Sequence, residues 1–292
     1  MSATPFSTTL PSLSAVVTRL RAAGCVFAED EARLLVSAAD TPAALTGMVS
    51  RRTAGLPLEH VIGWAEFYGL RITVDAGVFV PRRRTEFLVR QAAALIHQTP
   101  AGRPAVVVDL CCGSGALGAA LLAAAHGSVE EYDPVELYAS DIDPAAVACA
   151  RRNLAAGGTV LEGDLFDALP DGLRSRIDIL IANVPYVPTR DVALLPSEAR
   201  EHEPLVALDG GDDGLDVLRR VTAGAPGWLA PGGHLLFETS ERQVPDAVRT
   251  VRRDGLAPRV VTSEEWEATV VVAQLRGARL GAVALSPDPR GR

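Results

Sequence analysis

The segment best suited to take part in a chemical reaction is Asn183-Val184-Pro185-Tyr186, which follows the mostly apolar run 178–182. A run of this length predicts a strand that ends before the proline, so the Asn183 amide and nearby carbonyl groups are presented at the strand's carboxyl end. Open α/β sheets bind their ligands at that edge. The segment offers hydrogen-bond acceptors and an aromatic ring but no acid, base or nucleophile, which suits a substrate that must be held and oriented. We interpret residues 183–186 as a catalytic loop.

A second candidate site is a glycine-rich loop that follows an earlier predicted strand and opens a helix. Glycines there let a ligand approach the backbone, and the helix start supplies unpaired N–H donors. Its glycines match the G-x-G-x-x-G pattern, which does not separate a nicotinamide enzyme from an adenosyl one. In an S-adenosylmethionine site, the loop packs under the amino-acid part and an acid ends the strand. The residues concerned are Asp109, Cys111, Cys112, Gly113, Ser114 and Gly115.

Further acidic residues follow the next predicted strands. Asp141 ends the second strand, where a carboxylate can accept hydrogen bonds from both ribose hydroxyls of either nucleotide cofactor. Asp143 is interpreted as the cap of a helix that starts at Pro144. After the third strand, Asp164 is a candidate acceptor for an adenine amino group, and Leu165 for packing against the ring.

From residue 105 onward the chain alternates between strand and helix patterns, which is typical of a doubly wound parallel sheet. We therefore predict a Rossmann-like α/β fold. Strands are expected at residues 105–110, 136–140, 159–161, 177–182 and 234–238, and two late strands at 259–262 and 269–274.

The part of the chain before this pattern has a different organisation. Residues 1–56 show the spacing of three short helices, the third capped by Asp40 or Thr41. Residues 57–81 predict a β-hairpin turned at Gly69. The main domain is expected at 82–278 and a flexible tail at 279–292. The helices suit a structural cap and a docking surface for a macromolecular partner equally well.

Composition narrows the function classes. The net charge is −8, which argues against a general nucleic-acid binder. The four cysteines lack the spacing of a zinc site or a disulfide scaffold, the five histidines are scattered, and no apolar run approaches the width of a bilayer. We expect no metal and no membrane contact, a cytoplasmic location and a monomer. The run Arg82-Arg83-Arg84 predicts a solvated face unless it borders a substrate groove.

Taken together, these motifs resemble the S-adenosylmethionine-dependent methyltransferases with an Asn-Pro-Pro-Tyr type of loop. More narrowly, the chain is similar to the protein N(5)-glutamine methyltransferases that act on class 1 peptide-chain release factors. The likeness extends over nearly the whole chain, through residues 57–60, 66–69, 80–86, the glycine loop, Asp141, 163–164, the catalytic loop, 203–208, 211–215 and 229–233.

The resemblance implies that the Asn183 side-chain oxygen and the Val184 carbonyl each accept one N–H of a glutamine amide and aim its nitrogen at the methyl group of S-adenosylmethionine. Pro185 and Tyr186 complete the loop, and Asn183 also contacts the cofactor. The implied substrate is the glutamine of a Gly-Gly-Gln loop in a release factor, which makes residues 1–56 a substrate-docking domain.

Two positions depart from the family pattern. Val184 replaces the first loop proline, and Thr239-Ser240 replace the glycine segment that follows Glu238. Three alternatives stay open. The same loop could act on another protein, a small molecule or a nucleic-acid base. The glycine pattern alone leaves open a nicotinamide-dependent oxidoreductase, and Val184 leaves open a cofactor-binding interaction protein with weakened catalysis.

Overall fold

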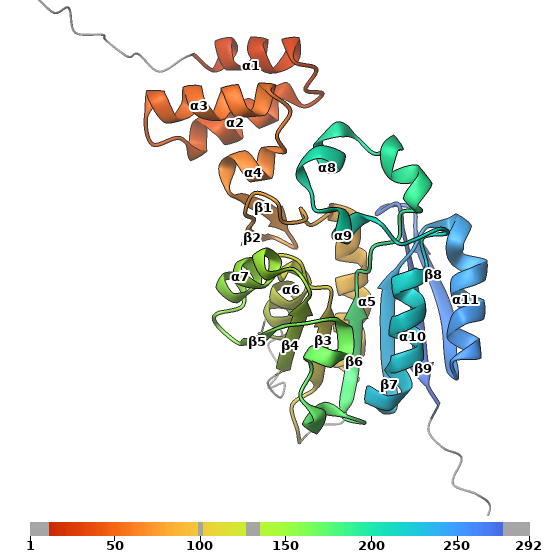
Figure 1. Cartoon of the computed structure of the whole chain (residues 1–292). Helices are drawn as coiled ribbons and strands as arrows, with labels where there is room; N and C mark the ends of the chain where they lie inside the picture. Colours follow the sequence, from red (N-terminus) through yellow and green to blue (C-terminus); the bar gives the residue numbers. More distant parts are fainter. Residues whose placement is uncertain (1–11, 99–101, 127–134, 277–292) are drawn as a thin grey trace, which may run out of the picture.

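The computed structural model describes residues 12–98, 102–126 and 135–276, so the predicted tail at 279–292 lies outside the described residues. An N-terminal group of helices leads through a small hairpin into a large twisted sheet covered by helices on both faces (Figure 1). The helices are α1 Leu13–Ala22, α2 Ala28–Ala38, α3 Pro42–Thr53, α4 Leu58–Ile62, α5 Glu86–Ile96, α6 Ala116–His126, α7 Pro144–Asn153, α8 Ser197–His202, α9 Leu205–Leu208, α10 Asp216–Trp228 and α11 Val244–Arg253. The strands are β1 Trp64–Phe67, β2 Leu70–Thr73, β3 Val106–Leu110, β4 Glu136–Asp141, β5 Gly158–Glu162, β6 Ile177–Ala182, β7 Leu229–Glu238, β8 Leu256–Ser263 and β9 Ala268–Leu275.

The central sheet has the strand order β5-β4-β3-β6-β7-β9-β8. The first five strands in this order are parallel, whereas β9 runs antiparallel to β7 and β8 antiparallel to β9. This arrangement confirms the predicted doubly wound sheet. Leu110 pairs with Ser140 on one side and with Ala182 on the other, and Ala182 pairs with Phe237. The carboxyl ends of β3, β4, β6 and β7 therefore lie at the same level.

The two faces of the sheet carry separate cores, because side chains alternate along each strand. On one face, Val107 and Ile179 pack with α5, α6 and α7. On the other face, Val108 and Leu180 pack with α10 and α11. Every residue of β3 and β6 is buried, as expected for strands covered on both sides.

The expected strands agree with the observed ones apart from their ends. β7 is longer than predicted and begins at Leu229, because Pro231-Gly232-Gly233 continues it through an irregularity in its pairing with β6. The short helices α8 and α9 between β6 and α10 had no clear periodic signal. Among the described residues, every helix is too short or too polar to cross a bilayer.

Helices α1 to α4 enclose a small core of their own around Leu20, Leu35 and Leu45. The cap of α3 is Thr41, whose Oγ1 accepts from the Ala44 N–H at 3.1 Å. The hairpin β1–β2 follows, with Tyr68 and Gly69 at its turn, both at positive φ.

Arg52 connects the N-terminal helices to the segment after β6. Its guanidinium bonds both carboxylate oxygens of Glu31, at 2.6 and 3.0 Å, and reaches Glu198 of α8 at 2.6 Å. Arg52 is 7% exposed, so this is a largely buried network. Since α8 is more than a hundred residues farther along the chain, this ion pair helps to set how the helices sit against the sheet domain.

We expect Arg52→Met to lower the free energy of unfolding by about 3 kcal/mol, because Glu31 would be left buried without its partner. Urea unfolding followed by circular dichroism measures the change. Arg33→Met is the matched control, since Arg33 pairs with Asp30 on the surface and should cost less than about 1 kcal/mol. Equal losses in the two variants would contradict this role for Arg52.

Candidate active site

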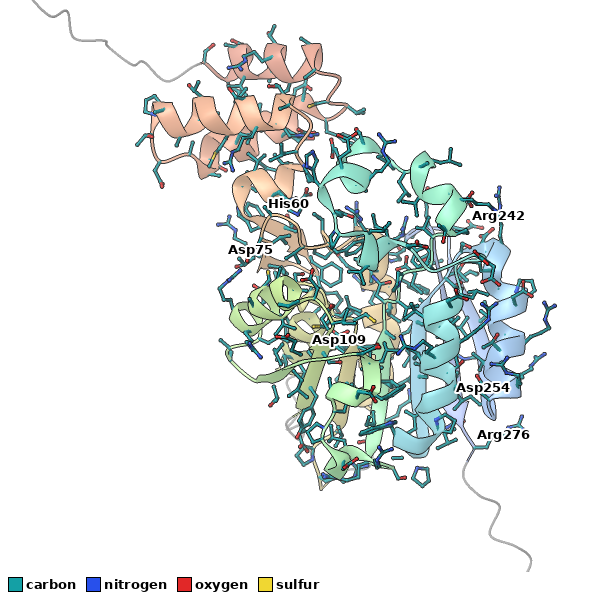
Figure 2. All side chains as sticks on the ribbon, viewed as in Figure 1. His60, Asp75, Asp109, Arg242, Asp254 and Arg276 are labelled. Carbon is teal, nitrogen blue, oxygen red and sulfur yellow. The ribbon has the colours of Figure 1, made fainter. Side chains whose placement is uncertain are left out.

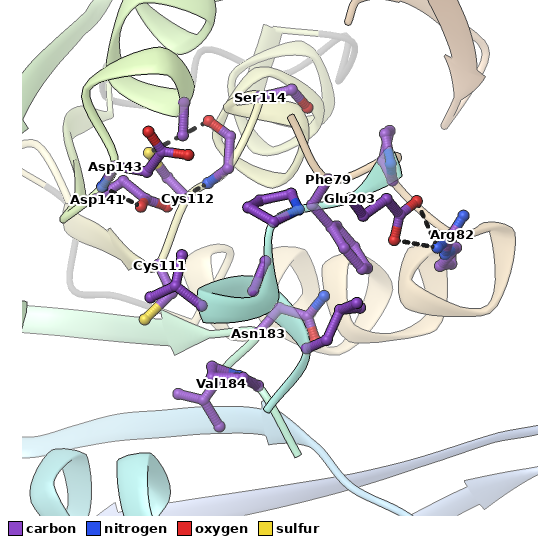
Figure 3. A pocket seen from close by; sticks show the side chains of 18 of the residues that line it. Phe79, Arg82, Cys111, Cys112, Ser114, Asp141, Asp143, Asn183, Val184 and Glu203 are labelled. Carbon is purple, nitrogen blue, oxygen red and sulfur yellow. Dashed lines mark hydrogen bonds and ion pairs between the residues drawn. The ribbon is translucent and has the colours of Figure 1, made fainter. Parts of the chain in front are cut away.

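One cavity lies at the carboxyl ends of the parallel strands and has a volume of about 520 Å³ (Figure 3). This volume is in the range of small-molecule and cofactor sites. It brings together most of the residues predicted from sequence, namely Cys111, Cys112, Gly113, Ser114, Asp141, Asp164, Leu165, Asn183, Val184, Pro185 and Tyr186. Two others, Asp109 and Gly115, lie behind its wall.

The loop after β6 presents an unsatisfied acceptor. Asn183 Oδ1 is buried and has no hydrogen-bond partner within the described parts of the chain. Such an orphan is uncommon in folded proteins, and at a cavity a ligand that brings a donor is one way to satisfy it. The next residue, Val184, is 2% exposed and packs its side chain into the sheet core. Packing therefore fixes the backbone at Val184, where the family pattern has proline.

The same loop is braced from behind by a second segment. The Val187 N–H donates to the Leu208 carbonyl, and the Gly210 N–H donates to the Val187 carbonyl. Gly214 has φ +78°, and a Cβ placed there would lie 2.3 Å from the Tyr186 carbonyl oxygen. Only glycine permits this approach. The glycine-rich segment 210–214 is thus the support on which the catalytic loop rests.

Tyr186 is held at both its ends. Its carbonyl accepts from Gln243 Nε2 at 2.9 Å, and its hydroxyl lies 3.1 Å from Glu238 Oε1 and also accepts from the Arg84 guanidinium. Burial and the Glu238 carboxylate raise the pKa of Tyr186 to about 12. The hydroxyl therefore stays protonated at neutral pH and does not act as a base.

The glycine loop wraps around the carboxylate of Asp141. Asp141 Oδ2 accepts from the Gly113 N–H at 2.8 Å, and Oδ1 accepts from the Asp143 N–H at 3.0 Å. Burial raises the pKa of Asp141 above its ordinary value. Asp143 caps α7 through Ala145 at 2.9 Å, as predicted. Asp141 is therefore fixed at the cavity with lone pairs left for a ligand hydroxyl.

Asp109 lies deep in the molecule, beneath the glycine loop (Figure 2). Its Oδ2 accepts from the Gly118 N–H at 3.2 Å, while its Oδ1 has no partner among the described residues. Gly115 sits at φ +77°, where a Cβ would approach Ala150 within 3.1 Å. In this structure both residues shape the loop from behind, so direct contact with a cofactor stays a prediction for them.

Asp164, which also lines the cavity, forms an ion pair with Arg220. Its Oδ2 lies 2.7 Å from the Arg220 guanidinium of α10. Leu165 lines the cavity with φ 50°, a conformation that few side chains adopt. An adenine ring at this position would pack on Leu165. Its amino group would donate to the Asp164 carboxylate, which is already paired with Arg220.

Sequence reasoning missed several residues around the cavity. Arg82 Nη2 bonds both oxygens of Glu203 at 2.6 Å, and its guanidinium lies 4.8 Å from the ring centre of Phe79 (Figure 3). Arg84 Nε bonds Glu238 at 2.8 Å. Arg82 and Arg84 line the cavity, which is the exception that the sequence left open for the run 82–84, and their side chains are still 34% and 48% exposed. Glu238 carries a signal that was available, since it ends an apolar strand as Asp141 does.

These residues fit S-adenosylmethionine, the cofactor that the resemblance implies. The predicted roles stay open to all of them: Asp141 has lone pairs left for ribose hydroxyls, Leu165 lines the cavity where an adenine is predicted, and the glycine loop borders it where the amino-acid part is predicted. Among the described residues, Asn183 Oδ1 has no partner that a substrate would have to displace.

The buried carboxyl of Asp109 should make the free energy of unfolding depend on pH, which can be tested. Burial raises the pKa of Asp109 from 3.8 to about 8. Between these values the folded state holds a proton that the unfolded state has lost, so this residue makes the free energy of unfolding fall as the pH rises. We expect Asp109→Asn, which keeps an acceptor for Gly118, to weaken that decline. Urea unfolding of both proteins at pH 5 and pH 8 measures it, and parallel pH profiles would contradict the shift.

Known proteins that are similar to this chain are also methyltransferases. Residues 69–195 match the model of the methyltransferase small domain family. A methyltransferase structure from Pyrococcus furiosus has a TM-score of 0.51 at 15% identity, covering 78% of this chain and 99% of that one, which shows a shared fold. Release factor glutamine methyltransferase of Moorella thermoacetica is 40% identical over 212 residues, 70% of each chain. That of Geobacter sulfurreducens is 37% identical over 216 residues, 73% of this chain and 71% of its own. At this identity and coverage, the chain belongs to the release factor glutamine methyltransferase family.

Proposed function

We propose that this protein transfers a methyl group from S-adenosylmethionine to the side-chain amide nitrogen of a glutamine in a peptide-chain release factor, within its Gly-Gly-Gln loop. The observation that carries the proposal is the buried Oδ1 of Asn183 at the cavity, which has no partner in the part of the chain that the structure describes. An acceptor in that state suits a ligand that brings an N–H donor, as an amide does. Family membership removes the nicotinamide-dependent oxidoreductase left open by the glycine pattern.

The proposed mechanism relies on positioning. An amide nitrogen is a poor nucleophile because its lone pair is delocalised. Asn183 Oδ1 and the Val184 carbonyl each accept one N–H of the glutamine, which fixes the nitrogen for in-line attack and stabilises positive charge as it develops there. S-adenosylmethionine supplies the electrophilic methyl group. Tyr186 forms a wall of the pocket and does not take the proton lost from nitrogen, because it stays protonated itself. In this proposal that proton passes to solvent.

The division of the chain is part of the same proposal. Residues 1–56 form the docking domain for the release factor, 57–81 the link, and 82–278 the methyltransferase domain. The core of α1 to α4 is separate from the two cores of the sheet, which supports this division, although it takes in α4 and so extends into the first residues of the link. The Arg52–Glu198 ion pair places these helices next to a segment that lines the cavity. The partner is a protein rather than a nucleic acid or a membrane, in keeping with the net charge of −8. Free cysteines throughout suit the reducing cytoplasm.

The direct experiment incubates purified, unmodified release factor with the protein and S-adenosylmethionine, followed by peptide mass spectrometry. We expect one added methyl group on the glutamine of the Gly-Gly-Gln loop. Asn183→Ala should reduce the rate by about a hundredfold or more, because an oriented acceptor is lost at the reacting atom. Thermal unfolding controls for the fold. A near-normal rate in Asn183→Ala would overturn the assignment.

Val184 offers a second prediction. The Val184 side chain is already buried in the sheet core, so the backbone of the loop is held in place. We therefore expect Val184→Pro to raise kcat by less than about tenfold, because proline would only stiffen this backbone further. Single-turnover methylation of the release factor measures this. A larger gain would show that the natural loop is poorly organised for catalysis.

A further inference from the structure

Methyl transfer concentrates positive charge in this cavity. The sulfonium of S-adenosylmethionine is a cation, and the accepting nitrogen gains positive charge as the methyl group moves. Nevertheless, three arginines line the cavity, Arg82, Arg84 and Arg220. An uncompensated guanidinium there would repel both the cofactor and the transition state, by an amount that is reduced by solvent because these three side chains are 34% to 55% exposed.

Each of these arginines is matched by a carboxylate. Arg82 pairs with Glu203, and Arg220 pairs with Asp164. These two carboxylates also line the cavity. The carboxylate that pairs with Arg84 is different, because Glu238 lies behind Arg84 and is only 4% exposed. It faces the cavity through Arg84 and Tyr186 rather than directly.

Glu238 is fixed on both oxygens. Its Oε2 accepts from Thr85 Oγ1 at 2.8 Å, and its Oε1 accepts from Arg84 Nε at 2.8 Å and from the Tyr186 hydroxyl at 3.1 Å. Thr85 is 1% exposed at the start of α5, so the carboxylate has one well-defined position. Arg84 in turn donates to the Tyr186 hydroxyl, which closes a triangle of three side chains at the catalytic loop.

We propose that Glu238 is a positioning residue for methyl transfer, which cancels the charge of Arg84 beside the methyl donor and holds Arg84 and Tyr186 against the catalytic loop. This inference rests on the proposed function, because it takes S-adenosylmethionine as the ligand. It assigns a role to a residue that touches neither cofactor nor substrate. The pairing also accounts for an arginine in the lining of a cavity that must accept a cation.

The test compares two ligands that differ in one charge. S-adenosylmethionine carries the sulfonium, whereas S-adenosylhomocysteine has a neutral sulfur and otherwise the same groups apart from the methyl. Calorimetry gives the dissociation constant Kd of each, and their ratio isolates the charge at sulfur. A loss of packing alone would weaken both ligands together and leave the ratio unchanged.

We expect Glu238→Gln to raise the Kd of S-adenosylmethionine about three- to tenfold more than that of S-adenosylhomocysteine, because Arg84 becomes uncompensated. Arg84→Gln should shift the ratio in the opposite direction, since it leaves the Glu238 carboxylate unpaired. The double variant should return the ratio to that of the natural protein. Arg83→Gln is the matched control: Arg83 stacks on Trp266 at 5.5 Å, outside the cavity, and should leave the ratio unchanged.

An unchanged ratio in Glu238→Gln, or shifts of the same sign in the two single variants, would overturn the inference. If Glu238→Gln does not fold, the direction of the shift in Arg84→Gln decides alone. Failure of the natural protein to bind S-adenosylmethionine would instead overturn the proposed function, so the two failures are distinguishable.

Discussion

The site depends on the register of the parallel strands, which aligns their carboxyl ends at one edge of the sheet. Leu110, Ser140, Ala182 and Phe237 pair side by side across β3, β4, β6 and β7. The residues that come directly after them are therefore delivered to one edge of the sheet: Cys111 of the glycine loop, Asp141, Asn183 and Glu238. A shift of one residue in any pairing would turn these side chains to the other face and bury the wrong groups in the two cores.

Backbone geometry then makes the edge specific. The catalytic loop is pressed against the glycine segment 210–214, where a Cβ at Gly214 would collide with the Tyr186 carbonyl. Gln243 Nε2 bonds the carbonyls of Tyr186 and Asp213, at 2.9 and 3.0 Å, and so joins loop and support through one side chain. A rigid support matters because the chemistry relies on orientation, and a small displacement of the acceptor atoms would be costly.

Electrostatic pairing is the third element. The chain has arginine but no lysine, and the planar guanidinium can bond a carboxylate through two donors at once. Arg82 with Glu203, Arg84 with Glu238 and Arg52 with Glu31 and Glu198 each join segments far apart in the sequence. These pairs fix the walls of the cavity and the placement of the N-terminal helices.

The sequence by itself determined the doubly wound sheet and the loops that carry the chemistry. Apolar runs of strand length, interrupted by glycine, proline and acidic residues, specify where β3, β4 and β6 end, and a polar residue after such a run marks Asp141 and Asn183. Local patterns of this kind are readable because they reflect the chain's own periodicity. The tertiary structure decided which acids reach the cavity. It placed Asp109 and Gly115 behind the wall, paired Asp164 with Arg220, and brought Arg84, Tyr186 and Glu238 together from three distant segments. Sequence spacing does not encode these contacts, because they depend on how separate elements pack across the sheet edge.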